Sequence, residues 1–406
     1  MTLHGARALE DLFADLPDRS GEVAPVSRAE RDARVRRLGA LLVEHDLDAL
    51  LLEPSSTLAY LSGVAWGTSE RLFALLVLAD ASVFWIAPGF ERLRAEERIA
   101  AGGPDGPVVT WEEHEYAWRP LHDALRARGV RRLAVDPRAR AFVLAGLIER
   151  LGAENVRSGA DLVRALRCRK DAHELALLRK ANEITKDAIL AVSERLTAGT
   201  TDHELGAMLR AAQSRMGLVD LWVLPLLAEG AAYPHGAAGG RVLAAGDTVL
   251  VDTGGSLHGY QSDVTRTWVF GAEPGADVRR AWSTVRDAQR AAFAALRPGV
   301  ACRDVDRAAR AVIEAAGYGD GYAAFAHRLG HGIGLDGHEE PCLDGGSRVL
   351  LEPGMTFSNE PGIYLPGRIG LRIEDVVVVT DDGADVFGGW QLEPESPRSE
   401  GQWTLA

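Results

Sequence analysis

The stretch Asp252-Thr-Gly-Gly-Ser-Leu-His-Gly-Tyr-Gln-Ser-Asp263 places an aspartate at each end of a glycine-rich connection. The mostly β-branched run 248–251 before it and the alternating run 263–270 after it both indicate strands. The glycines between them allow a hairpin or a bulged turn. Asp252 is therefore expected to end one strand and Asp263 to begin the next, with the two carboxylates close together. Since unpaired like charges at that distance force one carboxyl to keep its proton, the pair predicts a divalent cation.

A second strand pair carries two further acids. In Gly370-Leu-Arg-Ile-Glu374, Arg372 and Glu374 are two residues apart and so share one face of a strand, while the residues between them point into a core. Glu360 stands directly before Pro361-Gly362, where a strand must end and a turn begin. Charged side chains in such apolar surroundings indicate a site rather than a solvated surface.

With His331 of the segment His331-Gly-Ile-Gly, the candidate set holds four carboxylates and one imidazole. That charge is about what two divalent ions require. An oxygen-rich set without sulfur favours manganese, cobalt(II), iron(II) or zinc over copper(I). Two metals held ~3.5–4 Å apart can bind a water and lower its pKa enough to give hydroxide near neutrality.

Composition excludes several other classes of protein. A chain of 406 residues is too long for one ordinary core, so two domains are expected. The net charge of −13 argues against nucleic acid and anionic membranes as partners. The first twenty residues mix acids with apolar residues and lack the layout of a secretory signal, which predicts a cytoplasmic protein. Three widely spaced cysteines suggest neither a disulfide framework nor a thiolate zinc site.

The first part of the chain, 1–165, is predicted to be an α/β domain. Ser27 and Glu30 form a capping box that opens a helix, whose arginine-rich stretch 28–37 is expected to be its solvated face. Further elements are predicted at the strand ranges 48–52, 72–79, 82–86 and 132–135 and the helix ranges 121–128 and 141–151.

The second part, 166–406, begins with a basic stretch that is either a linker or the start of a long helix. Thr201 and Glu204 form another capping box. Beyond it, two strand pairs alternate with two helices, 278–296 and 305–316. This repetition suggests an internal two-fold, with a curved sheet at the centre and helices outside.

Five motifs, taken together, resemble the pita-bread hydrolases of the aminopeptidase P, prolidase and creatinase family, and are closest to Xaa-Pro dipeptidase. The motifs are Val-Asp-Thr-Gly-Gly at 251–255, Ser-Asp-Val-Thr-Arg-Thr at 262–267, His-Arg-Leu-Gly-His-Gly-Ile-Gly at 327–334, Asn-Glu-Pro-Gly-Ile-Tyr at 359–364 and Arg-Ile-Glu-Asp at 372–375. One motif alone is weak, but all five in this order are specific. The resemblance implies a creatinase-like α/β domain at 1–165 and an α+β pita-bread catalytic domain with an internal pseudo-two-fold at 166–406.

The same resemblance implies roles for individual residues. Two divalent metal ions, manganese before cobalt or zinc, would be bound by Asp252, Asp263, His331, Glu360 and Glu374. Glu360 would also carry a proton from the attacking water to the leaving nitrogen, His338 would steady the tetrahedral intermediate and contact substrate, and His327 would assist catalysis. His235 and Arg372 would contact the substrate.

The implied reaction is hydrolysis of an Xaa-Pro bond, a tertiary amide with no N–H, by a metal-bridging hydroxide. The expected substrate is a small peptide with proline in second position, with dipeptides preferred. Three alternatives stay open: an aminopeptidase P acting on longer Xaa-Pro peptides, a non-catalytic pita-bread binding protein, and a metal-dependent hydrolase of another C–N or P–O bond in the same cleft. The resemblance also implies a homodimer.

Each candidate also has a plainer interpretation. Asp252 and Asp263 could be turn-forming aspartates, although the other ligands make this reading weak. A loop histidine is the plainer interpretation of His235. For His327 it is a packed histidine, and for His338 a surface histidine. Arg372 could serve only in a structural ion pair with Glu374 or Asp375. The tryptophans, Trp222 among them, are interpreted as core. Asn359 departs from the family pattern, and the tail after Thr380 has no assigned role.

Overall fold

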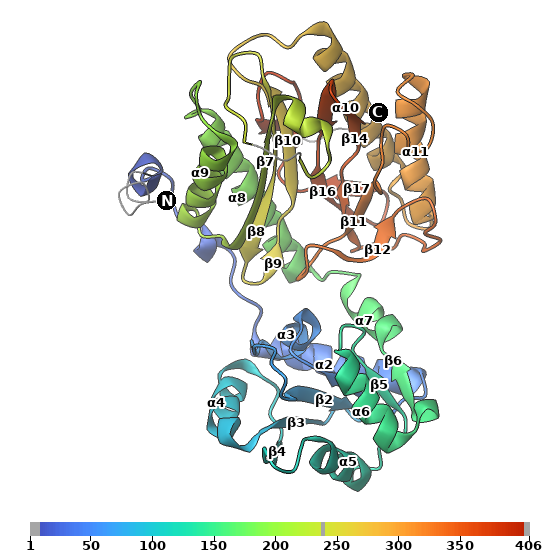
Figure 1. Ribbon diagram of the computed structural model, residues 1–406. Helices are drawn as coiled ribbons and strands as arrows, with labels where there is room; N and C mark the ends of the chain where they lie inside the picture. Colours follow the sequence, from blue (N-terminus) through green and yellow to red (C-terminus); the bar gives the residue numbers. More distant parts are fainter. Residues whose placement is uncertain (1–8, 237–239, 402–406) are drawn as a thin grey trace. The chain divides into compact units, whose positions relative to one another are not determined.

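The computed structural model describes residues 9–236 and 240–401 and divides the chain into two compact units (Figure 1). One unit is Pro25–Arg167. The other runs from Cys168 onward and includes the described residues up to Ala24. The predicted domain boundary after residue 165 lies two residues before the break that separates the units.

Residues 9–24 lie elsewhere than predicted, because they belong to the second unit and not to the N-terminal domain. Their contacts explain this. The Phe13 side chain is fully buried, and the Arg195 guanidinium lies 5.3 Å from its ring centre. The backbone N–H of Arg19 donates to the carbonyl of Met216 at 3.1 Å. These contacts join residues nearly two hundred positions apart, which no local sequence pattern reveals.

The unit Pro25–Arg167 is the expected α/β domain. Its six-stranded mixed sheet has the order β4-β3-β2-β1-β5-β6. The strands are β1 Ala49–Leu52, β2 Ala74–Leu78, β3 Val83–Pro88, β4 Val108–Trp111, β5 Leu133–Val135 and β6 Val156–Ser158, and the helices are α2 Arg28–Glu44, α3 Ser56–Ser62, α4 Arg92–Gly102, α5 Trp118–Ala127, α6 Ala141–Leu151 and α7 Ala160–Arg167. Every predicted element is present. The elements α3, α4, α7, β4 and β6 were not predicted.

Helix α2 begins with the predicted capping box of Ser27 and Glu30. Its arginine-rich stretch is only partly solvated, which corrects the prediction. Arg34 is buried, with its guanidinium 4.0 Å from the ring centre of Tyr60 and Nη1 donating to the Tyr60 carbonyl at 3.1 Å. The arginine can be buried because it combines a cation–π contact with a hydrogen bond.

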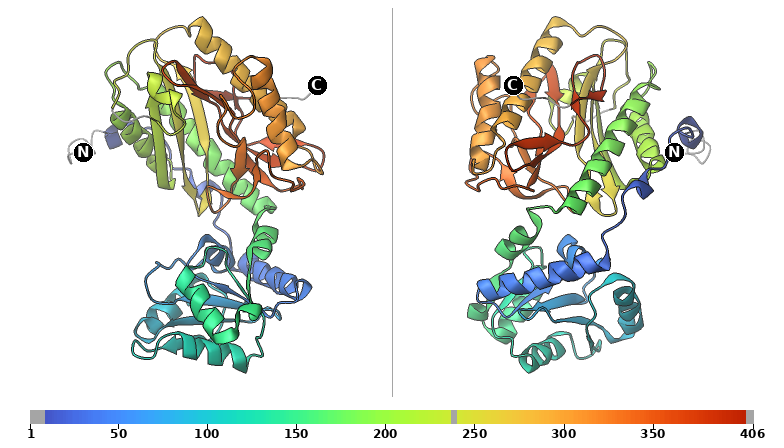
Figure 2. Two further views of the ribbon diagram at one scale, coloured as in Figure 1. Left: turned by 45° about the vertical axis from the view of Figure 1, so that its right-hand side comes forward. Right: turned by 180° about the vertical axis from the view of Figure 1, so that it is seen from behind.

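The second unit consists of two similar halves (Figures 1 and 2). In the first, helices α8 Ala172–Ser193 and α9 Asp202–Arg215 pack on the sheet β10-β8-β7, formed by β7 Val219–Leu227, β8 Thr248–Leu257 and β10 Val264–Val269, with β9 Tyr260–Gln261 paired to β8. In the second, helices α10 Ala276–Ala295 and α11 Cys302–Ala315 pack on a sheet of order β12-β11-β13-β16-β17. Its strands are β11 Gly330–Gly332, β12 Glu339–Leu343, β13 Thr356–Asn359, β16 Asp375–Val379 and β17 Ala384–Val386.

Two small strand pairs complete this unit. The hairpin of β14 Gly362–Leu365 and β15 Ile369–Arg372 follows β13, and β18 Trp390–Gln391 pairs with β19 Ser399–Glu400 near the end of the described chain. The two helix pairs lie on the outside and the strands between them, as the sequence predicted (Figure 2). No helix in the described ranges combines the length and the apolar character needed to cross a membrane.

Asp252 does not end its strand, which corrects the predicted hairpin. Strand β8 continues to Leu257, and the turn falls at His258 and Gly259, both with positive φ. Asp252 pairs with Thr265 of β10, and Asp263 stands two residues before Thr265. All three side chains therefore point to the same face. The predicted proximity of the two acids is correct, although the geometry is that of neighbouring positions on paired strands.

The glycines that suggested an early turn serve a different purpose. A Cβ atom at Gly254 would lie 1.9 Å from the carbonyl oxygen of Ser262. The two chain segments can approach this closely only because the side chain is missing.

Candidate active site

All nine candidate residues line one cavity of about 500 Å³ in the second unit. The strands around it explain the positions of the acids. Asp252 lies on β8, and Asp263 directly precedes β10. Glu360 follows the last residue of β13, and Glu374 precedes β16. The remaining candidates in the wall are His235, His327, His331, His338 and Arg372.

Arg372 and Glu374 both reach the cavity, as their spacing predicted, even though β15 ends at Arg372 and β16 begins only at Asp375. The intervening Ile373 and the preceding Leu371 are fully buried in the hydrophobic core. The shared face is therefore kept across a short break in the strand.

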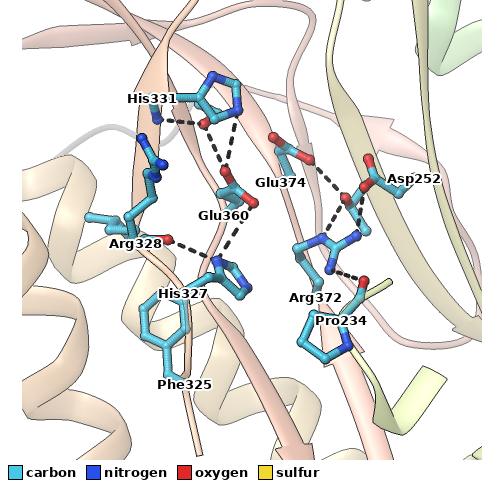
Figure 3. A network of polar contacts seen from close by, with 12 residues as sticks. Pro234, Asp252, Phe325, His327, Arg328, His331, Glu360, Arg372 and Glu374 are labelled. Carbon is cyan, nitrogen blue, oxygen red and sulfur yellow. Dashed lines mark hydrogen bonds and ion pairs between the residues drawn. The ribbon is translucent and has the colours of Figure 1, made fainter. Parts of the chain in front are cut away.

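Arg372 holds one side of the site together (Figure 3). Its Nη2 donates to Oδ2 of Asp252 at 2.6 Å, and its Nε donates to Oγ1 of Thr265 at 3.0 Å. Nη1 donates to the hydroxyl of Tyr364 at 2.7 Å and to the carbonyl of Pro234 at 3.2 Å. The predicted ion pair with Glu374 or Asp375 is corrected, because the guanidinium pairs with Asp252 instead. Each guanidinium nitrogen already has a protein partner.

His331 carries its proton on Nδ1, since that atom lies 3.1 Å from the carbonyl oxygen of Gly332, which can only accept. Burial, and next the neighbouring His338, lower the pKa of His331 to about 3, so the ring is neutral. The lone pair on Nε2 then faces Oε1 of Glu360 at 3.4 Å and Oδ2 of Asp263 at 3.5 Å. A neutral imidazole nitrogen and two carboxylate oxygens that converge in this way, with the other ring nitrogen held by a backbone carbonyl, are the arrangement of metal ligands.

The carboxyl groups show the same crowding. Burial, with Asp252 and Glu360 nearby, raises the pKa of Asp263 well above its ordinary value. Burial is also the main reason that the pKa of Glu374 is raised far above its ordinary value. For Glu360, burial outweighs the opposing effect of Arg372 and raises the pKa to about 8. Such shifts mark a site where ionised carboxylates need a cation.

A divalent metal pair fits these donors. Oδ1 of Asp252 is buried and has no hydrogen-bond partner among the described residues. Potential ligand atoms lie within 4.8 Å of one another in two groups that share Glu374 and together contain all five predicted ligands: Asp252, Asp263 and Glu374 in one, and His331, Glu360 and Glu374 in the other. A third group joins Asp263 and His331 to His338, so His338 can also reach an ion.

His327 uses both ring nitrogens within the protein. Nδ1 lies 2.8 Å from the carbonyl of Arg328 and therefore donates, and burial lowers the pKa of the ring to about 3. Nε2 must then accept from the Tyr364 hydroxyl at 2.8 Å. That hydroxyl in turn accepts from Arg372. The chain Arg372–Tyr364–His327 links the two sides of the cavity.

Several residues of this site were not predicted from the sequence. Trp222, interpreted as core, lines the cavity beside Leu224, Pro234, Arg328 and Gly337. Tyr364 lies in one of the five motifs but was not singled out. Its proximity to His327 and Arg372 depends on the β14–β15 hairpin, so only the folded chain shows it.

The chain belongs to metallopeptidase family M24, which matches residues 176–381, and it is a metallopeptidase. Residues 34–169 match the creatinase/prolidase N-terminal domain. These two matches confirm the expected architecture and the expected enzyme class.

Similar proteins cover nearly the whole chain. The probable dipeptidase PepE of Mycobacterium tuberculosis is 38% identical over 362 residues, which cover 88% of this chain and 95% of the relative. The Xaa-Pro dipeptidase of Lactobacillus delbrueckii subsp. lactis is 33% identical, with coverages of 85% and 94%. The crystal structure of dipeptidase PepE from Mycobacterium ulcerans is similar with a TM-score of 0.83 at 35% identity, covering 92% of this chain and 99% of that one.

Solved prolidase structures share the same fold. The prolidase from Thermococcus sibiricus gives a TM-score of 0.78 at 30% identity, with coverages of 88% and 96%. The expected pita-bread catalytic domain is thereby confirmed.

Proposed function

We propose that this metallopeptidase hydrolyses the Xaa-Pro bond of dipeptides. The observation that carries the proposal is the convergence of Asp252, Asp263, His331, Glu360 and Glu374 on one cavity of about 500 Å³. That volume suits a small peptide rather than a folded protein. The relatives named as dipeptidases and Xaa-Pro dipeptidase support the substrate class.

These residues would hold divalent ions, which would supply the Lewis acidity needed to activate water and polarise the scissile carbonyl. Glu360 is the group that moves the proton. Its Oε1 accepts from the Ser358 hydroxyl at 3.1 Å, while Oε2 lies 3.9 Å from Nδ1 of His327. Oε2 therefore takes the proton of the attacking water and delivers it to the proline nitrogen, which has no proton of its own.

The wall of the cavity supports dipeptides over longer peptides. Four of the five N–H groups of Arg372 donate to Asp252, Thr265, Tyr364 and Pro234, so its main role is to position the site. Arg328 is exposed and lines the same cavity. In the described parts of the chain its Nη1 donates to a thiol, Sγ of Cys342, at 2.8 Å. Its guanidinium can pair with the free carboxylate that a dipeptide places next to the scissile bond.

A substrate panel tests the choice between the two peptidase readings. Ala-Pro and Leu-Pro are compared with an Xaa-Pro-Yaa tripeptide at saturating manganese. Turnover of the dipeptides is expected. Cleavage of the tripeptide alone would assign the aminopeptidase P reaction.

Metal analysis tests the non-catalytic alternative. The purified protein is expected to hold more than one equivalent of divalent metal, and Asp263→Asn is expected to lower both metal content and turnover. The Asn side chain keeps the size of the aspartate and removes its charge. Unchanged metal content and turnover in this variant would contradict an enzyme that depends on the site.

Three finer points belong to the same proposal. Manganese is proposed because the donors are rich in oxygen and lack sulfur. A cytoplasmic location is proposed from the composition, and a homodimer from the family resemblance. Light scattering on the purified protein measures the last of these directly.

A further inference from the structure

The segment Trp390–Glu400 lies beyond residues 176–381, the part of the chain that matches the metallopeptidase family. It contains β18 and β19, in which Trp390 pairs with Glu400 and Gln391 with Ser399. Trp390 is fully buried and meets Phe293 edge-on at 4.9 Å between ring centres. The segment is therefore anchored in the core of the second unit.

This segment covers the free edge of β10, the strand that ends its sheet. The N–H of Val269 donates to the carbonyl of Pro394 at 2.9 Å. The Gln391 side chain donates from Nε2 to the carbonyl of Thr267 at 2.8 Å and accepts from the N–H of Thr267 at 3.4 Å. An edge strand that would otherwise expose its backbone groups is thus closed by side-chain and main-chain contacts.

Arg266 of β10 connects this segment to the candidate metal site. Its side chain is completely buried. On one side, Nη2 and Nε donate to the Ser399 hydroxyl at 2.7 and 3.2 Å. On the other, Nη1 donates to the carbonyl of Glu374 at 2.7 Å and Nη2 to Oδ1 of Asp375 at 2.7 Å. One guanidinium therefore contacts both the tail and the backbone of a predicted ligand.

Glu374 is fixed at three points, all of them on β10. Its N–H donates to the carbonyl of Thr265 at 3.0 Å, and its Oε2 accepts from the Thr265 hydroxyl at 2.7 Å. The third point is the carbonyl held by Arg266. The orientation of the Arg266 guanidinium therefore helps to set the position of the Glu374 carboxylate.

We propose that Ser399 is a positioning residue for the metal centre, acting through Arg266 on Glu374. In the described chain the Ser399 hydroxyl is the acceptor for Nε of Arg266. Without it, a buried guanidinium loses that acceptor and turns to find another, and the Glu374 backbone moves with it. The inference rests on the proposed metal site and is independent of the substrate.

A matched pair of variants tests the proposal. Ser399→Thr keeps the hydroxyl, whereas Ser399→Val has the shape of threonine without it. Ser396→Ala is the control, because Ser396 lies in the same segment and its hydroxyl accepts only from the N–H of Arg398 among the described contacts. Manganese alone is titrated into the metal-free full-length proteins, and free Mn²⁺ is followed by electron paramagnetic resonance. Thermal unfolding of each metal-free protein is measured in parallel.

We expect Ser399→Val to raise the Kd for the weaker manganese ion about tenfold, the size typical of lost support behind a ligand. The Kd values of Ser399→Thr and Ser396→Ala for manganese should stay close to that of the wild-type protein. Equal manganese affinities for the Thr and Val variants would overturn the proposal. This includes the case in which both variants lose affinity equally because both have a lower melting temperature. If the unchanged protein binds manganese but hydrolyses no Xaa-Pro peptide, the proposed function fails while this proposal stands.

Discussion

In the proposed function, the carboxyl group of Glu360 has two roles, as a metal ligand and as a proton carrier. Its pKa of about 8 in the metal-free site has burial as its main cause. A cation opposite that carboxyl favours the ionised form and lowers the pKa again. The same group can thus release its proton when the site is loaded and retain it when the site is empty.

The raised pKa of Glu360 predicts how the stability of the metal-free protein depends on pH. Below the ordinary value of 4.5, folded and unfolded states both hold the proton, so Glu360 makes no difference. As pH rises from 4.5 to about 8, the unfolded state ionises while the folded state resists, and the free energy of unfolding falls. Urea denaturation in the presence of a chelator should show this decline, and Glu360→Gln should reduce it. A flat profile in that range would contradict the assigned burial.

Arg328 offers a second residue-scale prediction. Arg328→Gln should raise the KM for Leu-Pro about tenfold or more, the effect of losing a charge-assisted hydrogen bond. The KM for the amide Leu-Pro-NH2, which has no carboxylate, should change little. Arg348→Gln is the matched control, since Arg348 is an exposed arginine outside the cavity. Equal effects on both substrates would show that Arg328 does not bind the carboxylate.

At the scale of elements, sequence patterns were most reliable where the cause is local. The capping boxes of α2 and α9 were both read correctly, because a Ser or Thr and a Glu three residues later satisfy the first N–H groups of a helix. The end of β8 was placed too early. The glycines after Asp252 do not form a turn. Gly254 instead allows the backbone of Ser262 to approach closely, and only the folded chain distinguishes the two roles of glycine.

The cap of α9 gives a prediction of its own. Thr201 accepts from the N–H of Glu204 at 3.2 Å, and the Glu204 carboxylate accepts from the N–H of Thr201 at 2.9 Å. Thr201→Ala should lower the free energy of unfolding by about 1 kcal/mol. Thr201→Ser keeps the hydroxyl and should recover most of the loss. Equal stability of the Ala and Ser variants in chemical denaturation would contradict the capping role.

At the scale of the whole molecule, the sequence predicted two domains and a boundary close to the observed one. It missed the assignment of residues 9–24, because a segment of a few apolar residues carries no signal about its distant partners. The same limit applies to the candidate site. The five ligands stand in recognisable motifs, whereas Trp222 stands in none of them, and Arg328, although it lies in the motif at 327–334, is identified as a site residue only by the cavity that it lines.

Phe13 tests the role of this N-terminal segment. Its ring is fully buried in the second unit. Phe13→Ala should destabilise that unit by about 3–5 kcal/mol, the usual cost of removing a buried aromatic ring. Leu12→Ala is the neighbouring control, because Leu12 is exposed. Hydrogen exchange should show lost protection in α8 and α9 of the Phe13 variant and leave β1 to β6 unchanged.

The predicted ligands come from both halves of the catalytic unit. Asp252 and Asp263 stand on or beside the strands of one sheet, and His331, Glu360 and Glu374 on or beside those of the other. Bound cations would connect the two sheets and add to the free energy of unfolding with the logarithm of their concentration over Kd. The half-life of the protein in a cell would then depend on the supply of metal, because the metal-free protein unfolds more often.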